Sequence, residues 1–318
     1  MRAPPASFPN THDLAIGLGE VLGDDVRVLD RSPAIWASTY PAEVVTCQLG
    51  GRDELKLYCK YLGGQVYNSF GHRGGLAYEV DVYRGVLNGL SLSLPRFYGA
   101  YEQPTTCDLW LVLEYLDQAL RVTKGPQPQT VARAARWIGH FQAANETRIS
   151  DPGTAFLRRY DSEYYLGWAR RTLQFASEMD INLPWLAPLC MRFEECVAML
   201  LSSPATIIHG EFYPHNVLMR GTEIYPIDWE SAAIGAGEID LATLTEDWSP
   251  ECIRQCDQAY RQARWNKATP AGFDDRLAAA RLYLCFRWMG EQPEWTLDSA
   301  NHSYFDQMRA LGELLGLI

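Results

Sequence analysis

The sequence predicts an α+β protein whose first part is rich in strands and whose remainder is mostly helical. Val44–Leu49 and Leu55–Leu62 have the composition of strands, and Gly50–Asp53 joins them as a turn. Leu109–Tyr115 is almost entirely apolar, as expected of a central strand. From Thr130 onward apolar residues recur at helical spacing, so helices are expected to dominate the second part.

Composition limits the classes of partner. With 318 residues, the chain can form one large domain or two smaller ones, and 47% hydrophobic with 21% charged residues is ordinary for a globular protein. The net charge of −11 argues against nucleic acid, which requires a basic surface, and is compatible with a cationic small-molecule substrate. No apolar run reaches the roughly 18 residues that span a bilayer, so no membrane partner is expected.

The expected compartment is the cytoplasm. The N-terminal residues MRAPPASFPNTHD lack the apolar segment of a secretory signal. The eight cysteines form no Cys-x-x-Cys pair and lie mostly in apolar segments. This pattern favours buried thiols in a reducing compartment over a zinc site. The sequence leaves the oligomeric state open.

The elements follow in order along the chain. Thr11–Leu22 carries an apolar stripe at helical spacing, with Asn10 or Thr11 as its N-cap. Gly75–Leu90 is the next expected helix. Phe97–Tyr101 is a further expected strand, before the one that begins at Leu109. The later helices are expected at Met191–Leu201, Leu241–Trp248, Glu251–Trp265, Asp274–Met289 and Ser303–Leu317.

One stretch combines short strands with oxygen-bearing side chains. Ile207–Glu230 reads as strand, polar loop, strand, tight turn and strand, and a Gly- and Ala-rich loop is expected to follow it. The polar loop carries Glu211 and Asn216, and the last strand ends at Asp228. We expect these three side chains at one mouth of the hairpin. Two carboxylates and an amide are a ligand set that suits magnesium and does not suit zinc. The same set also suits a reaction in which a hydroxyl must lose a proton.

The same stretch resembles the catalytic core of an enzyme family. His209, an acid two residues later, Asn216, and then Ile227-Asp228-Trp229 about a dozen residues on form a pattern similar to the aminoglycoside phosphotransferase and choline kinase-like family, and to the protein-kinase catalytic loop. The resemblance implies a bilobal protein kinase-like fold. Its small antiparallel-sheet N-terminal lobe, residues 1–116, would bind nucleotide, and its mostly helical C-terminal lobe, residues 117–318, would hold the catalytic and substrate-binding residues.

The resemblance also implies nucleotide-binding residues. In the family, a lysine at the end of a strand holds the α- and β-phosphates, and a glutamate on the next helix orients it. Lys60 matches the lysine best, with Lys56 as the fallback, and Glu79 matches the glutamate. Backbone groups of Glu114 and Leu116 are implied to pair with the adenine edge. The implied cofactors are ATP and Mg²⁺, and the choice between ATP and GTP stays open.

The catalytic side follows from the same match. Asn216 and Asp228 correspond to the magnesium ligands, and Glu211 takes the position of the residue that orients or deprotonates the acceptor hydroxyl. His209 is implied to brace the loop. Asp240, in a Gly-acid-x-Asp-Leu-Ala segment that is also similar to the family, is expected to act structurally.

Two positions depart from the family. The family has aspartate where this sequence has Glu211, and the segment Arg31–Glu43 has no glycine where a Gly-rich phosphate-covering loop is usual. Ser38 and Thr39 remain as candidate phosphate contacts there.

The resemblance implies a phosphotransferase that moves the γ-phosphate of ATP or GTP to a hydroxyl of a small acceptor, such as an aminoglycoside or an amino sugar. A cationic acceptor would suit the acidic chain. The alternative is a catalytically impaired pseudokinase, or a non-catalytic small-molecule-binding protein on the same scaffold. A role in antibiotic resistance, in biosynthesis or in primary metabolism is left open.

Overall fold

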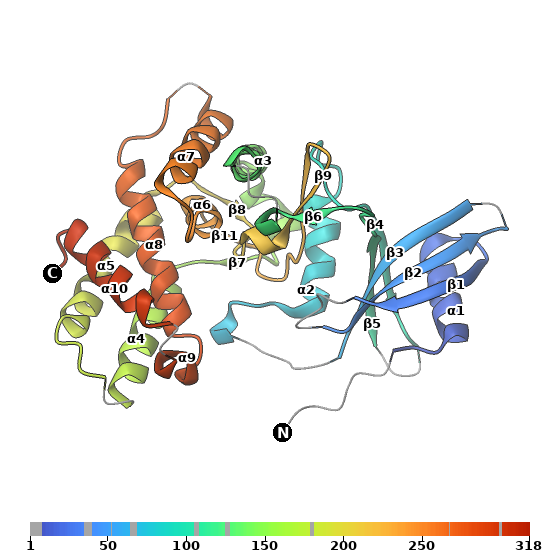
Figure 1. The fold of residues 1–318 in the computed structure, drawn as a ribbon, viewed down its shortest axis with the longest axis horizontal. Helices are drawn as coiled ribbons and strands as arrows, with labels where there is room; N and C mark the ends of the chain where they lie inside the picture. The colour runs from blue at the N-terminus through green and yellow to red at the C-terminus, as the bar shows by residue number, and fades with distance from the viewer. Residues whose placement is uncertain are drawn as a thin grey trace. The chain divides into compact units, whose positions relative to one another are not determined.

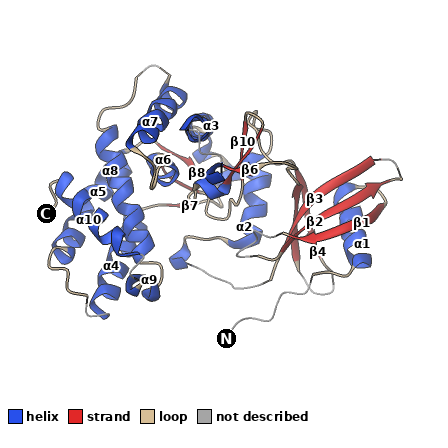
Figure 2. Ribbon diagram, viewed as in Figure 1, coloured by secondary structure: helices blue, strands red, loops and turns tan. Residues whose placement is uncertain are grey.

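The chain forms two units, and the first is discontinuous in sequence. The computed structural model describes residues 8–34, 40–51, 53–63, 69–104, 108–124, 128–178, 181–266, 268–298 and 301–318. The first unit combines Met1–Leu120 with Leu218–Ser231, and the second combines Arg121–Val217 with Ala232–Ile318. Figures 1 and 2 show the long strands in the first unit and most helices in the second. The lobes expected at 1–116 and 117–318 differ from this division mainly at residues 218–231, and the roles assigned to them stay a prediction.

The first unit is built on an antiparallel five-stranded sheet in the order β1-β2-β3-β5-β4. The strands are β1 (Val26–Pro33), β2 (Ala42–Leu49), β3 (Asp53–Tyr61), β4 (Phe97–Glu102) and β5 (Leu109–Glu114). In the central strand, Lys60 lies opposite Ala42 of β2 and Leu111 of β5. The predicted strands are therefore confirmed, and the sheet places Lys60 between two neighbouring strands.

Helix α1 (Thr11–Leu22) packs against this sheet (Figure 1). It begins at Asn10, whose side-chain oxygen accepts a hydrogen bond from the Asp13 amide at 2.9 Å, so the predicted N-cap is Asn10. Leu14 and Leu18 are fully buried in the core. Their buried neighbours from the sheet are Val45, Cys47, Leu57, Cys59, Tyr61, Tyr101, Trp110 and Val112.

The first unit also contains a second helix and a hairpin. Helix α2 (Gly75–Val82) continues into a wider π-helical turn, Tyr83–Leu87, so the helix expected to reach Leu90 ends three residues earlier. The short strands β9 (Val217–Arg220) and β10 (Glu223–Pro226) lie next to each other in a sheet and are joined by a tight turn. This hairpin leads directly to Asp228. A two-residue strand, β6 (Leu120–Arg121), lies where the chain passes between the units.

The second unit is mostly helical. Its helices are α3 (Pro128–Asn145), α4 (Ser162–Glu178), α5 (Leu186–Ser202), α6 (Glu238–Leu244), α7 (Pro250–Trp265), α8 (Phe273–Met289), α9 (Pro293–Leu297) and α10 (His302–Leu314). Helices α3 and α7 approach closely at Gly139, where an added Cβ would lie 2.9 Å from the Cβ of Ala263. The helices predicted in this part of the chain are present, with ends that shift by a few residues.

A small sheet, β7-β11-β8, completes the second unit. Its strands are β7 (Arg158–Arg159), β8 (Ala205–Ile208) and β11 (Ala233–Ala236). The expectation of a loop after Glu230 was wrong at β11, which pairs antiparallel with β8 and is fully buried. Apart from Ile234, the strand consists of alanine and glycine, which carry little strand propensity, so pairing with β8 and burial decide that this segment is a strand.

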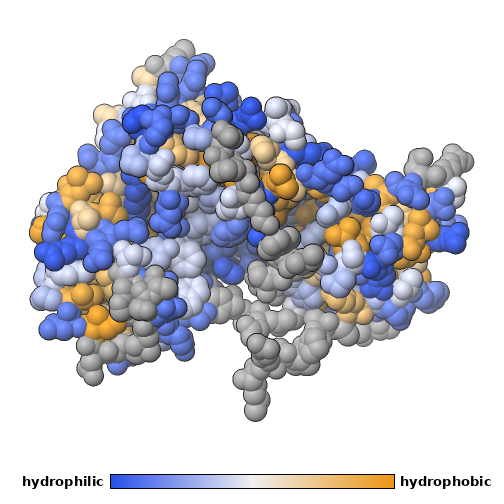
Figure 3. Space-filling model, viewed as in Figure 1, coloured by the Kyte–Doolittle hydropathy of each residue, from blue (hydrophilic) through white to orange (hydrophobic). Residues whose placement is uncertain are grey.

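The surface and the cysteines complete the description. On the face drawn in Figure 3, hydrophilic and hydrophobic residues are interspersed over both units. Among the described helices, none combines the length and the hydropathy needed to cross a membrane. The described cysteines are free thiols, and all except Cys190 are buried, as predicted. Burial raises the pKa of the Cys47 thiol to about 11. Cys107 lies outside the described residues.

Candidate functional site

A buried lysine is shared by two carboxylates in the first unit. Lys60 Nζ donates to Glu79 Oε2 at 2.6 Å and to Asp228 Oδ1 at 2.7 Å. Lys60 and Glu79 are 8% and 1% exposed, whereas the Asp228 side chain is 30% exposed. The Lys60 ammonium also lies 5.2 Å from the centre of the Tyr40 ring. Three residues that are far apart in sequence therefore form one cluster, and its only partly exposed member is Asp228.

The local structure explains why these side chains meet. Lys60 comes from β3, Glu79 from α2, and Asp228 from the turn after β10. Asp228 has φ +68°, in the left-handed region that non-glycine residues seldom adopt. The next residue, Trp229, is fully buried and donates its backbone amide to Glu79 Oε1 at 3.2 Å. Glu79 therefore holds both the lysine and the strained turn that carries Asp228.

Several ionisable side chains surround this cluster and shift one another's pKa values. Burial would lower the pKa of Lys60, but Asp228, Glu79 and Glu230 together raise it well above its ordinary value. Glu230 is 1% exposed, and the Arg73 guanidinium lies 3.7 Å from its carboxylate. Burial, with the nearby Asp228 carboxylate, raises the pKa of Glu230 to about 8. Lys60 is therefore held as a charged ammonium.

The two candidate lysines have different surroundings. Lys56 Nζ pairs with Asp117 Oδ2 at 2.9 Å, and both side chains are about half exposed. Lys60, in contrast, contacts the predicted partner Glu79. Of the backbone groups implied to pair with the adenine edge, the Glu114 amide donates to the Arg96 carbonyl at 2.8 Å. The Glu114 side chain pairs with Arg220 at 3.0 Å, so this side chain is used within the first unit.

The predicted catalytic loop lies in the second unit, directly after β8. Gly210 has φ +81°, a conformation that favours glycine, and turns the chain into Glu211. The Glu211 amide donates to His209 Nδ1 at 3.3 Å, and the Asn216 side-chain amide donates to the Glu211 carbonyl at 3.1 Å. Glu211, His209 and Asn216 are all buried. The structure brings these three together in the second unit, and places Asp228 in the first.

Asp240 braces this loop from α6. Its carboxylate accepts hydrogen bonds from the His209 amide at 2.9 Å and the Gly210 amide at 3.0 Å. A third bond, at 2.9 Å, comes from Gln142 of α3, whose own oxygen accepts from the Tyr260 hydroxyl at 2.6 Å. Burial raises the pKa of Asp240 to about 6, against the lowering effect of its donors. The structural role expected of Asp240 thus has a geometric basis.

Sequence reasoning missed a buried arginine beside Glu211. Arg287 of α8 is 1% exposed, and its Nη1 lies 3.6 Å from Glu211 Oε1 and 2.8 Å from Glu291 Oε2. The only signal in the sequence is one arginine inside the largely apolar run Leu282–Met289, which has no spacing relation to Glu211. The candidate phosphate contacts Ser38 and Thr39 lie outside the described residues.

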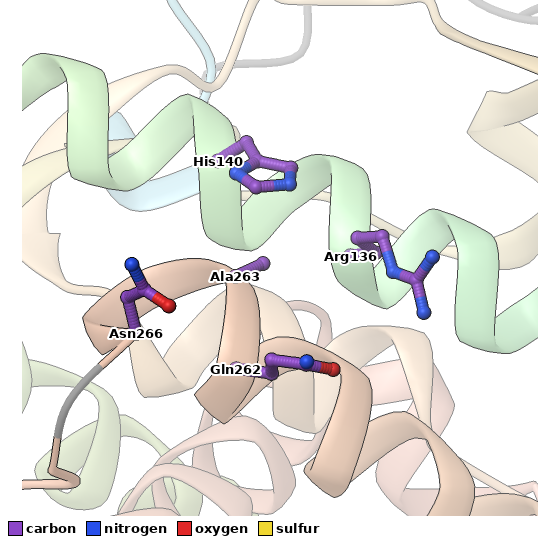
Figure 4. Close-up of a pocket in the computed structure, with 5 residues that line it drawn as sticks. All are labelled: Arg136, His140, Gln262, Ala263 and Asn266. Atoms are coloured by element: carbon purple, nitrogen blue, oxygen red, sulfur yellow. The ribbon is translucent and has the colours of Figure 1, made fainter.

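A hollow of about 460 Å³ lies on the second unit between α3 and α7 (Figure 4). Arg136 and His140 of α3 face it from one side, and Gln262, Ala263 and Asn266 from the other. None of the predicted site residues lines it. His140, expected to be a surface histidine, is exposed at its edge.

Comparisons with known proteins agree with the predicted fold. The macrolide 2'-phosphotransferase MphH from Brachybacterium faecium superposes with a TM-score of 0.58 at 14% identity, covering 94% of this chain and 98% of that one. The GDP complex of wild-type aminoglycoside 2'-phosphotransferase-IIIa gives a TM-score of 0.59 at 14% identity, covering 95% of this chain and 98% of that one. Choline kinase LicA from Streptococcus pneumoniae superposes with a TM-score of 0.60 at 12% identity, covering 96% of this chain and 98% of that one. The predicted bilobal protein kinase-like fold is confirmed.

Sequence comparison gives the family. N-acetylmuramate/N-acetylglucosamine kinase from Neisseria meningitidis serogroup B (strain ATCC BAA-335 / MC58) is 29% identical over 97 residues, which is 29% of this chain. The match spans only 28% of the length of that relative. The model of the phosphotransferase enzyme family (APH) matches residues 70–273, more than half of the chain. The chain therefore belongs to the phosphotransferase enzyme family.

Proposed function

We propose that this protein transfers the γ-phosphate of ATP or GTP to a hydroxyl group of a small molecule. The observation that carries the proposal is the buried Lys60–Glu79 pair, with Asp228 on its exposed side. A lysine that is held charged and fixed in direction suits the nucleotide's phosphates. Transfer of a phosphoryl group depends mainly on such positioning and on neutralising charge.

Nucleotide and magnesium fit the residues of the first unit. Lys60 would bind the α- and β-phosphates, Glu79 would fix its direction, and Asp228 would offer a partly exposed carboxylate as a magnesium ligand. Because the Glu114 amide already donates to Arg96, the base edge pairs with the Glu114 carbonyl and the Leu116 amide. Magnesium, when bound, neutralises charge on the phosphate oxygens.

The residues of the second unit supply the acceptor chemistry. Glu211 orients the acceptor hydroxyl and takes its proton. As it does so, the acceptor oxygen bonds to the γ-phosphorus, and the bridging oxygen leaves with the nucleoside diphosphate. Asn216 offers an amide oxygen as a second magnesium ligand, because its nitrogen already donates to the Glu211 carbonyl. His209 braces the loop by accepting from the Glu211 amide.

We propose an amino sugar or an aminoglycoside as the acceptor. The matched stretch of the N-acetylmuramate/N-acetylglucosamine kinase supports the first, and the net charge of −11 supports a cationic aminoglycoside. N-acetylglucosamine, N-acetylmuramate and kanamycin are therefore the first acceptors to test, each with Mg-ATP and Mg-GTP.

The two lysines of β3 provide a matched test. Lys60→Met should lower phosphoryl transfer by about a hundredfold or more, because the phosphates lose their positioned cation. Lys56→Met removes a half-exposed lysine from the same strand and should leave the rate within about twofold. Asp228→Ala should abolish transfer. The measurement is release of ADP or GDP together with mass-spectrometric detection of phosphorylated acceptor.

The alternative function has its own signature. A pseudokinase or a non-catalytic binding protein would bind nucleotide or sugar without forming a phosphorylated product. Equal rates for Lys60→Met and Lys56→Met, or no product with any acceptor, would contradict the proposed transfer.

A further inference from the structure

Several described side chains contact the buried Arg287 guanidinium through its two Nη atoms. Arg287 is 1% exposed, and Nη1 donates to Glu291 Oε2 at 2.8 Å, while Nη2 donates to the Tyr213 hydroxyl. The guanidinium lies 4.8 Å from the centre of the Trp288 ring and 5.8 Å from that of Tyr213. These contacts fix both the position and the plane of the guanidinium.

The same guanidinium faces the predicted catalytic carboxylate. Nη1 lies 2.8 Å from Glu291 Oε2 and 3.6 Å from Glu211 Oε1. The Glu211 and Glu291 side chains are themselves almost fully buried. One arginine therefore compensates two buried carboxylates, one of which is the residue proposed to orient the acceptor hydroxyl.

The length of the side chain at 211 matters for this contact. The carboxylate of an aspartate at this position would lie farther from Arg287 by about one carbon–carbon bond, roughly 1.5 Å. A separation that is already 3.6 Å would then exceed the reach of an ion pair. The glutamate that departs from the usual family residue is thus the side chain that reaches Arg287.

We propose that Arg287 is a positioning residue that holds the Glu211 carboxylate in place for the reaction, and that Glu211 and Arg287 function as a matched pair. This inference rests on the proposed function, in which Glu211 orients the acceptor hydroxyl. Arg287 does not itself bind substrate; it acts through Glu211.

A kinetic double-mutant cycle tests the pair. Arg287→Lys keeps the charge but loses the planar fork, and Glu211→Asp withdraws the carboxylate. Each single change should lower kcat by about 10- to 100-fold and leave KM for Mg-ATP within about twofold. The double variant should be no more than about threefold slower than the slower single variant, because the second change has no pair left to break. The acceptor is whichever of the three probes is phosphorylated, or water if none is.

A thermal cycle tests the pair without any activity. Arg287→Met should lower Tm by several degrees, because two buried carboxylates lose their cation. Adding Glu211→Gln should recover part of that loss. Should Arg287→Met fail to fold, Arg287→Lys takes its place in the cycle.

Arg276→Lys is the matched control, since Arg276 lies on the same helix and pairs, buried, with Glu238 at 2.8 Å. Arg276→Lys should lower Tm by about as much as Arg287→Lys, but it should leave kcat within about twofold of that of the unaltered protein. If the kcat losses of the two single variants multiply in the double variant, and the Tm shifts of the thermal cycle add, Arg287 and Glu211 act independently and the proposed pairing is wrong. Absence of transfer by the unaltered protein would instead count against the proposed function, and the thermal cycle would still decide the pairing.

Discussion

At the scale of single residues, Asp240 shows how a buried carboxylate can organise a loop. Three N–H groups point at its oxygens, two of them from the backbone of His209 and Gly210. Buried donors left without an acceptor carry a desolvation penalty, so removing this carboxylate should disturb the residues beside Glu211. Asp240 therefore acts on the loop through the backbone and does not need to meet substrate.

Replacing one oxygen of Asp240 tests this role. Asp240→Asn turns an acceptor into a donor that faces backbone N–H groups, and should lower the free energy of unfolding by about 1–3 kcal/mol. Glu194→Gln, at an exposed position on α5, should change it by less than about 0.5 kcal/mol. Urea unfolding followed by circular dichroism measures both, and equal effects would remove Asp240 from the bracing role.

The pKa of Asp240 adds a dependence on pH. Because this pKa is raised from 3.8 to about 6 in the folded protein, the folded state keeps a proton that the unfolded state has lost between those values. Its contribution to stability is therefore complete below about pH 4 and is lost as the pH rises through about 6. The stability gap between the unaltered protein and Asp240→Asn should be wider at pH 4.5 than at pH 7. A stability difference that is instead wider at pH 7 would mean that the three hydrogen-bond donors lower the pKa of Asp240 by more than burial raises it.

At the scale of elements, α1 approaches the sheet more closely than its apolar stripe alone requires. Gly17 makes this possible: an added Cβ would lie 2.4 Å from the Trp110 ring and 2.8 Å from the Tyr101 ring. Those rings pack against each other with centroids 4.7 Å apart, so neither can move independently. The helix and the neighbouring strands β4 and β5 are thus fitted together at one glycine.

An alanine at this position should therefore be harmful. Gly→Ala inside a helix ordinarily stabilises by about 0.5–1 kcal/mol, but Gly17→Ala should destabilise by about 1–3 kcal/mol because the methyl group overlaps two packed rings. Ile16→Ala, at a neighbouring residue that is 46% exposed, should cost less than about 1 kcal/mol. Equilibrium unfolding measures both variants, and a stabilising Gly17→Ala would contradict this account of the packing.

At the scale of the whole molecule, the proposed functional residues are divided between the two units. Leu218–Ser231 belongs to the first unit, although the segments before and after it belong to the second. This segment carries Asp228, which contacts Lys60, the partner of Glu79. The loop with Glu211, His209 and Asn216 stays in the second unit. The cluster proposed to bind nucleotide and the loop proposed to act on the acceptor therefore belong to different units.

Ligand binding should appear in the stability of the intact protein. Mg-ATP at 100 times its Kd should stabilise the folded state by about 2.7 kcal/mol, which raises Tm by roughly 4 °C. EDTA should remove most of this shift, since Asp228 would lose its cation, and Asp228→Ala should show little of it. Differential scanning fluorimetry measures the shift, and an unchanged Tm with both Mg-ATP and Mg-GTP would speak against a nucleotide site.

The sequence by itself determined the class of the fold, most elements, and the residues proposed for chemistry. Periodicity identifies strands and helices, and the spacing from His209 to Asp228 identifies the family-like core, because both are local properties of the chain. Tertiary structure confirmed that Lys60 rather than Lys56 meets Glu79, and it alone decided that Ala233–Ala236 is a strand and that Arg287 faces Glu211. Each of these features depends on a partner that is distant in sequence. Pairing and burial against such a partner produce no local pattern of residues from which they could be predicted.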